Sequence, residues 1–265
     1  MKILRRVAGP GSAQTAREFA ELGIAVAADG YFGFWFDEAD PRWPALVEWR
    51  ARQGRFAEPL STTVFSKAEL KTAQWLEFAT DWQWGYPQPD EGDFGYLNVT
   101  YDDSGACGKC KVGLRQVAPF QFVGEPTWGR RSVLQLNWVF DELFVTPELW
   151  ETVFRPVGVG AREVHNTKGK TLSTVVQLVV EDRVDLDMDG FEFHTCEVCG
   201  TKKYTVISRG FHPKPVTEPW GAMCRSNQWF GSGGRAFQGL IASRDVYEAI
   251  EAAKAKGARF IPCAS

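Results

Sequence analysis

Two Cys-x-x-Cys pairs constrain this chain more than any other feature. They are Cys107–Cys110, within SGACGKCKV, and Cys196–Cys199, within HTCEVCGT. Two cysteines separated by two residues can turn both sulfurs toward one ion, and four thiolates close a tetrahedral shell around zinc. Glycines beside both pairs permit the tight turns that such ligation needs. We therefore expect one structural Zn²⁺ held by four cysteines, with no coordination position open for water.

The wide separation of the pairs leaves other interpretations open. Cys110 and Cys196 are 86 positions apart, far more than the roughly 15–20 residues between the pairs of a compact zinc ribbon. A dithiol redox centre, two separate sites and unrelated cysteines are the alternatives. A redox pair is typical of a helix N-terminus that follows a strand, whereas KKYTVI, a strand pattern, comes soon after the second pair. Shared structural zinc is the favoured interpretation.

An internal repeat accounts for the wide spacing. Residues 144–164 (FVTPELWETVFRPVGVGAREV) align without a gap with residues 241–261 (IASRDVYEAIEAAKAKGARFI). In both copies an apolar strand leads to a hydroxyl N-cap residue, Thr146 or Ser243, with acid in the first helical turn. A glycine then ends the segment, and an extended apolar stretch follows. Each copy is predicted to be a strand–helix–strand unit downstream of a CxxC pair.

These patterns predict an α+β protein, mainly antiparallel sheet with a few packed helices, in which a four-cysteine zinc site clips two related strand–helix–strand halves. A capping box formed by Ser66 and Glu69 predicts a helix over 66–80. The stretch that follows is rich in Pro, Gly and acid, so we expect a loop there. It divides an N-terminal α+β region, 1–90, from a duplicated zinc-knuckle region, 91–265. We expect both regions to pack as one globular unit.

Composition and motifs argue against several classes of function. With 30 Lys and Arg against 33 Asp and Glu, the net charge is −3, so nucleic acid is not the expected partner. No apolar run approaches the roughly 18 residues of a membrane span, and the N-terminus lacks the apolar core of a signal peptide. We therefore expect a cytoplasmic protein with no membrane partner. There is no GxSxG or HExxH motif and no Ser-His-Asp or Cys-His arrangement in supporting context, so we expect no enzymatic activity.

The order of motifs along the chain resembles a bacterial family. The motifs are WGYPQPD (84–90), the first CxxC pair, WGRR (128–131), LQLNWVFDELFVTPELWETVF (134–154), CEVCG (196–200) and WFGSGGRAF (229–237). This order resembles the bacterial double-CxxCG motif proteins, although Lys111 stands where the motif has glycine. The C-terminus, with IASR at 241–244 and GARFIP at 257–262, is similar to the ending of immunity proteins of polymorphic toxin systems. The resemblance implies a cytosolic protein that neutralises a toxin by binding it, and it assigns ligand roles to the four cysteines only.

A cognate protein toxin is therefore the expected partner, and a non-enzymatic binder is the first hypothesis. Tryptophan is enriched at binding hot spots, and acidic side chains suit a basic toxin surface. The candidate partner-binding residues are Trp82, Trp84, Asp90, Glu91 and Asp93. The alternative hypothesis is a zinc-ribbon protein that binds nucleic acid, and the third is an enzyme whose site carries no recognised motif.

Overall fold

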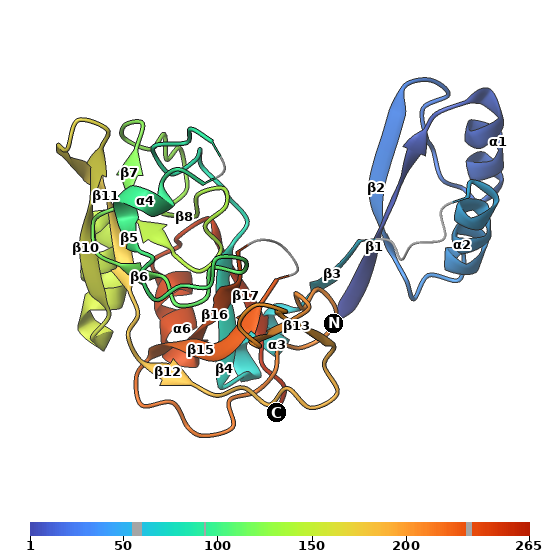
Figure 1. Cartoon of the computed structure of the whole chain (residues 1–265). Helices are drawn as coiled ribbons and strands as arrows, with labels where there is room; N and C mark the ends of the chain where they lie inside the picture. The colour runs from blue at the N-terminus through green and yellow to red at the C-terminus, as the bar shows by residue number, and fades with distance from the viewer. Residues whose placement is uncertain (55–59, 93, 232–234) are drawn as a thin grey trace. The chain divides into compact units, whose positions relative to one another are not determined.

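The chain divides into two compact units. A computed structural model describes residues 1–54, 60–92, 94–231 and 235–265. The first unit is Met1–Glu69 with Ile207–Gly210, and the second is Leu70–Val206 with Phe211–Ser265. Residues 70–90, which the sequence analysis grouped with the N-terminal region, contribute a central strand to the second unit. In Figure 1 most of the first unit is drawn in blue.

The first unit is a three-stranded antiparallel sheet with two helices. Its strands, in the order β2-β1-β3, are β1 (Lys2–Pro10), β2 (Tyr31–Asp37) and β3 (Ser61–Val64). The helices are α1 (Ala13–Glu21), which the Ser12 side chain caps, and α2 (Trp43–Arg52). Along β2 the phenylalanines at alternate positions share one face of the sheet. Phe32 packs there against Phe19 of α1 and Trp49 of α2, with ring centroids 5.4 and 5.8 Å away, and this forms a small aromatic core.

The helix that the capping box predicts is real but short. Ser66 and Glu69 bond reciprocally, with the backbone N–H of Ser66 donating to the Glu69 carboxylate at 2.7 Å. Helix α3 (Lys67–Thr72) nevertheless ends before residue 80, and β4 (Trp75–Thr80) follows at once. Buried and half-buried residues alternate along β4, which is the period of a strand. The prediction of a helix over 66–80 was therefore wrong from residue 73 onward.

The second unit contains two larger sheets and one short hairpin. One sheet has the order β13-β14-β15-β16-β4-β17, with β12 paired to β15, and the other has the order β7-β10-β11-β9-β8. The helices in the described ranges are short, and none combines the length and apolarity needed to cross a membrane. The remaining elements of this unit are α4 (Leu97–Thr100), β5 (Tyr101–Asp102), β6 (Arg115–Gln116), β7 (Gln121–Phe122), β8 (Val133–Leu134), β9 (Phe144–Val145), α5 (Pro147–Leu149), η1 (Trp150–Phe154), η2 (Arg155–Val157), β10 (Gly160–Asn166), β11 (Thr171–Val179), β12 (Arg183–Val184), β13 (Phe193–Thr195), β14 (Lys202–Tyr204), β15 (Met223–Phe230), β16 (Phe237–Ser243), α6 (Arg244–Ala252) and β17 (Ala258–Pro262).

The two sequence repeats form matching strand–helix–strand units. In the first, β9 and β10 flank α5, η1 and η2, and in the second β16 and β17 flank α6. Both helical segments begin at a hydroxyl cap, since Thr146 accepts from the N–H of Leu149 and Ser243 accepts from the N–H of Val246. In each repeat the two strands lie on either side of a third strand that runs antiparallel to both. This third strand is β11 in the first repeat and β4 in the second repeat. The predicted α+β class, with its two related halves, is confirmed.

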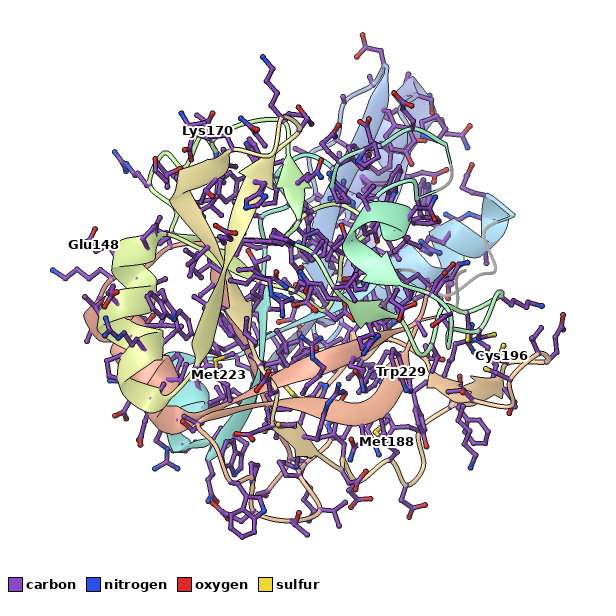
Figure 2. The ribbon with its side chains drawn as sticks, turned by 60° about the vertical axis from the view of Figure 1, so that its left-hand side comes forward. Glu148, Lys170, Met188, Cys196, Met223 and Trp229 are labelled. Carbon is purple, nitrogen blue, oxygen red and sulfur yellow. The ribbon has the colours of Figure 1, made fainter. Side chains whose placement is uncertain are left out.

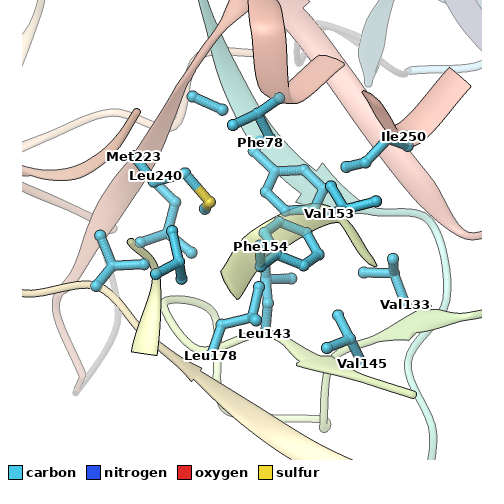
Figure 3. Packing of buried hydrophobic residues seen from close by; sticks show 14 of the residues in the cluster. Phe78, Val133, Leu143, Val145, Val153, Phe154, Leu178, Met223, Leu240 and Ile250 are labelled. Atoms are coloured by element: carbon cyan, nitrogen blue, oxygen red, sulfur yellow. The ribbon is translucent and has the colours of Figure 1, made fainter. Parts of the chain in front are cut away.

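A stack of aromatic rings joins the two repeats. Phe154 of η1 stacks on Phe78 of β4 at 6.0 Å between centroids, and Phe78 stacks on Phe260 of β17 at 4.9 Å. Tyr247 of α6 meets Phe260 edge-on at 5.2 Å. Figure 3 shows Phe78 and Phe154 facing each other among the aliphatic side chains of the core. Aromatic pairs add roughly 0.5–1.5 kcal/mol each beyond the area they bury, so this stack holds the two repeats together.

Phe154→Ala should therefore destabilise the second unit strongly. Phe154 is fully buried, and emptying such a site costs about 3–5 kcal/mol. Denaturant titration of the whole chain should show this loss in the transition of the larger unit. Phe140→Ala is the matched control, because Phe140 is 49% exposed and should change stability by well under half as much. Equal losses for the two variants would contradict the central place of the stack.

Candidate metal centre and the adjoining cavity

Both CxxC pairs lie at the tips of antiparallel hairpins. Strands β5 and β6 pair, and the loop between them carries Cys107 and Cys110. Strands β13 and β14 pair as well, and the turn between them carries Cys196 and Cys199. A strand thus leads into and out of each pair, and β14 confirms the strand that the sequence pattern predicts after the second pair.

The two hairpin tips adopt the same backbone turn. In the first, the N–H of Lys111 donates to the carbonyl of Cys107 at 2.9 Å, and in the second the N–H of Gly200 donates to Cys196 at 2.8 Å. Each leading cysteine N–H in turn donates to the carbonyl five residues on, in Val112 or Thr201. The residue after the second cysteine has a positive φ in both, 61° at Lys111 and 73° at Gly200. Lys111 therefore keeps the turn of the CxxCG motif while adopting a conformation that favours glycine.

The four sulfur atoms converge on one point. All four ligand atoms lie within 4.8 Å of one another. The Sγ atoms of Cys107 and Cys196 are 3.9 Å apart, and those of Cys110 and Cys199 are 3.5 Å apart. A tetrahedral ion with metal–sulfur bonds near 2.3 Å needs sulfur–sulfur distances of about 3.8 Å, whereas a disulfide needs about 2.05 Å. The four cysteines are thus spaced like ligands that could hold one metal ion.

Hydrogen bonds prepare part of this cluster for ligation. The side chain and backbone of Thr201 lower the pKa of Cys199 to about 6, and backbone N–H groups of Cys199 and Val198 lower the pKa of Cys196. Burial has the opposite effect on Cys110 and raises its pKa to about 12. Because only thiolates bind metal, Cys199 is ready to bind near neutral pH. A cation in the cluster would supply the driving force for releasing the other protons.

Further contacts fix the two tips to each other and to the sheet. Lys109 of the first tip forms an ion pair with Glu197 of the second. The carbonyl of Cys110 accepts from the N–H of Ala236, just before β16, at 2.9 Å. Strand β14 extends the large sheet by pairing in parallel with β15. Figure 2 labels Cys196 beyond the end of β15, which carries Trp229.

A cavity of about 400 Å³ lies beside the first tip, and we call it the arginine cavity. Lys111, Leu114 and Arg115 of the β5–β6 hairpin contribute to its wall, together with residues of both larger sheets. A buried ion network forms its inner end. Arg225 donates to the Glu142 carboxylate at 3.0 Å and to the Asp141 carbonyl at 2.7 Å.

A second buried arginine completes the network. Arg235 donates to the carboxylate of Asp141 at 3.1 Å and to the hydroxyls of Tyr96 and Tyr101 at 2.7 and 3.2 Å. Burial raises the pKa of Tyr96 to about 12, so this hydroxyl stays protonated. Glu142 also accepts from Gln177 at 3.0 Å. The buried charges are therefore paired, as buried charges must be.

Sequence reasoning missed this network. Its signal is a charge inside an apolar strand pattern, as in VFDELFV for Asp141 and Glu142 and in MCRSNQWF for Arg225. An isolated strand with such a charge would bury it without a partner. Two such apolar segments far apart in the chain indicate that their charges pair, although the sequence does not say which charge pairs with which.

A cysteine, a histidine and a glutamate also meet in the second unit. Cys263 Sγ is 4.0 Å from His212 Nδ1, and His212 Nε2 is 3.8 Å from the Glu77 carboxylate. Both distances exceed those of a working nucleophile–base pair. His212 Nδ1 lies closer to the Pro213 carbonyl, at 3.2 Å, and burial raises the pKa of the Cys263 thiol. This arrangement favours a packed neutral thiol over a nucleophile.

The candidate partner-binding residues divide into two groups. Trp82 and Trp84 are half-buried, with Trp82 against Trp128 at 5.7 Å and Trp84 against Phe122 at 5.4 Å. Asp90 and Glu91 are exposed, and Asp93 lies outside the described residues. The partner-binding role of these residues remains a prediction.

An exposed tryptophan that sequence reasoning did not single out lies between β14 and β15. Trp220 is 100% exposed. Its setting in TEPWG is the only signal for this, since Pro and Gly beside an aromatic residue indicate a surface turn.

Because the shared turn favours glycine at both positions, removing glycine from one hairpin tip and introducing it into the other should change stability in opposite directions. Gly200→Ala should lower the free energy of unfolding by about 1–2 kcal/mol, because a side chain disfavours a left-handed residue. Lys111→Gly should raise the free energy of unfolding by at most about 1 kcal/mol. Glycine removes the strain of a left-handed residue with a side chain, but this gain is partly offset by the greater freedom of glycine in the unfolded chain. Denaturant titrations with zinc present would measure both. A change of the free energy of unfolding in the same direction in both variants would contradict the shared turn.

No protein-family model matches the chain, and no curated protein matches it either. The four-cysteine cluster, the arginine cavity and the exposed Trp220 are therefore the features from which a function can be inferred.

Proposed function

We propose that Cys107, Cys110, Cys196 and Cys199 bind one structural Zn²⁺. Support comes from the sulfur spacing, from the matched hairpin turns and from the preference of zinc for a tetrahedral shell of four thiolates. With four protein ligands the ion has no position for water or substrate, so its role is to fix the two hairpins. Lys109 and Lys111 in the first tip and Lys202 beyond the second reduce the repulsion of the four negative charges.

Metal analysis of the purified chain should give one zinc per molecule. Cys199→Ser should lower this content and the midpoint of thermal unfolding, and a strong chelator should lower that midpoint in the wild type but not further in the variant. Cobalt-loaded protein should show the absorption bands of tetrahedral thiolate coordination. Cys224→Ala is the matched control, since Cys224 is a buried cysteine outside the cluster and should leave the zinc content unchanged. A metal-free chain with the cysteines joined in disulfides would overturn the assignment.

We further propose that the protein is a cytoplasmic, non-enzymatic binder that neutralises a bacterial toxin by direct contact. The observation that supports a binding role is the full exposure of Trp220. Burying a fully exposed indole in an interface removes much apolar surface from water, and tryptophan is enriched at binding hot spots. Asp90 and Glu91 offer exposed negative charge for a basic partner. The motif order along the chain, which resembles that of the double-CxxCG and immunity proteins, supports a toxin as the partner.

Affinity purification of the full chain from its native host should recover one protein in stoichiometric amount, and that protein should be toxic when expressed alone. Trp220→Ala should weaken the complex by about tenfold or more, which is the usual effect of losing a hot-spot tryptophan. Tyr31→Ala is the control, since Tyr31 is 70% exposed but belongs to the first unit.

Recovery of no stoichiometric partner would contradict the binding proposal. Retention of nucleic acid instead, falling steeply as salt rises, would favour the alternative of a nucleic-acid-binding zinc-ribbon protein. The cations near the hairpin tips would then be the contact surface.

A further inference from the structure

The arginine cavity carries more positive than negative side chains. Its three acidic lining residues are Asp141, Glu142 and Glu181, and its six cationic ones are Lys111, Arg115, Arg162, Arg183, Arg225 and Arg235. Two of the acids, Asp141 and Glu142, are already paired with Arg225 and Arg235 in the buried network. The network leaves the inner end close to neutral, and Asp102 pairs with Arg115 at 2.8 Å. The surplus positive charge therefore belongs to Lys111, Arg162 and Arg183.

Arg183 lies directly beside another arginine. Strands β12 and β15 pair in parallel with Arg183 opposite Arg225, and like charges at such a position repel each other. Gln238 accepts a hydrogen bond from Arg183 at 2.5 Å and orients its guanidinium. Arg183 remains exposed to solvent, and its partial burial and then the charge of Arg225 lower its pKa. Within the described part of the chain no carboxylate lies in ion-pair range of Arg183.

Arg162 reaches the same cavity from the other sheet. It lies opposite Gln177 across β10 and β11, so the two side chains project from the same face of the sheet. Gln177 belongs to the buried network, and this places Arg162 toward the arginine cavity, of which it is a lining residue. Arg162 is half-buried, and it too has no ion-pair partner among the residues that the structure describes.

We propose that the arginine cavity binds a small molecule through a carboxylate or phosphate group held by Arg162 and Arg183. A guanidinium presents a planar pair of N–H donors that matches both oxyanions. An oxyanion here would offset the repulsion between Arg183 and Arg225. The volume of about 400 Å³ lies within the range of small-ligand pockets, and it leaves room for more than the anionic group. The buried network positions the wall and does not itself take up the anion.

Binding of simple anions to the full zinc-loaded chain tests this proposal. Calorimetric titration with inorganic phosphate and with succinate, at an ionic strength fixed with sodium chloride, should show saturable binding of at least one of them. Phosphate alone would identify a phosphorylated ligand class, succinate alone a carboxylate class, and both a general oxyanion site. The midpoint of thermal unfolding should rise with the same anion, because a ligand of the folded state stabilises it.

The double variant Arg162→Gln/Arg183→Gln should weaken that affinity by about tenfold or more. Lys168→Gln/Lys170→Gln is the matched control, since it removes two exposed cations from the turn between β10 and β11, and it should bind the anion as the wild type does. Figure 2 labels Lys170 at that turn. Absence of saturable binding by both anions, or equal loss of affinity in the two double variants, would overturn the proposal. Zinc content and toxin binding are measured separately, so their failure would be distinct from this one.

Discussion

The stacked rings of Phe154, Phe78 and Phe260 are the contact on which the larger unit depends. They come from η1, β4 and β17. They therefore join the two strand–helix–strand repeats through β4, which lies between the strands of the second repeat although it comes much earlier in the chain. Once β4 is fixed between β16 and β17, strand β15 lies beside β16, and β14 carries the second cysteine pair at the sheet's end. The hydrophobic core therefore determines where one half of the cysteine cluster lies.

The cysteine cluster could be predicted because its chemistry is local. Each pair forms a tight turn set by a few neighbouring residues, and thiols at that spacing have few stable uses. The repeat could be predicted for a similar reason, since capping residues such as Thr146 and Ser243 act on the turn that follows them. The rest of the site could not, because Arg225 and Glu142 pair across more than eighty positions of sequence.

The boundary between α3 and β4 shows where local reasoning fails. Leu76 and Phe78 fit the apolar stripe of a helix as well as the alternation of a strand. The capping box at Ser66 favours the helix, but pairing with β16 and β17 outweighs that local preference over residues 75–80. Tertiary contacts of this kind routinely override propensity. Lys111 illustrates the same principle, since the turn of its hairpin tip imposes a conformation that its side chain disfavours.

The different sources of the third strands have a consequence for synthesis on the ribosome. Strand β11 follows its repeat at once, whereas β4 precedes β16 by more than 150 residues. At roughly 5–20 residues per second, β4 leaves the ribosome about 8–30 s before its partners exist. The first cysteine pair is likewise synthesised well before the second, with which it forms the cluster. Until then both edges of β4 stay unpaired in the nascent chain, and the first repeat, which supplies Phe154, is the part of the larger unit that can already cover Phe78.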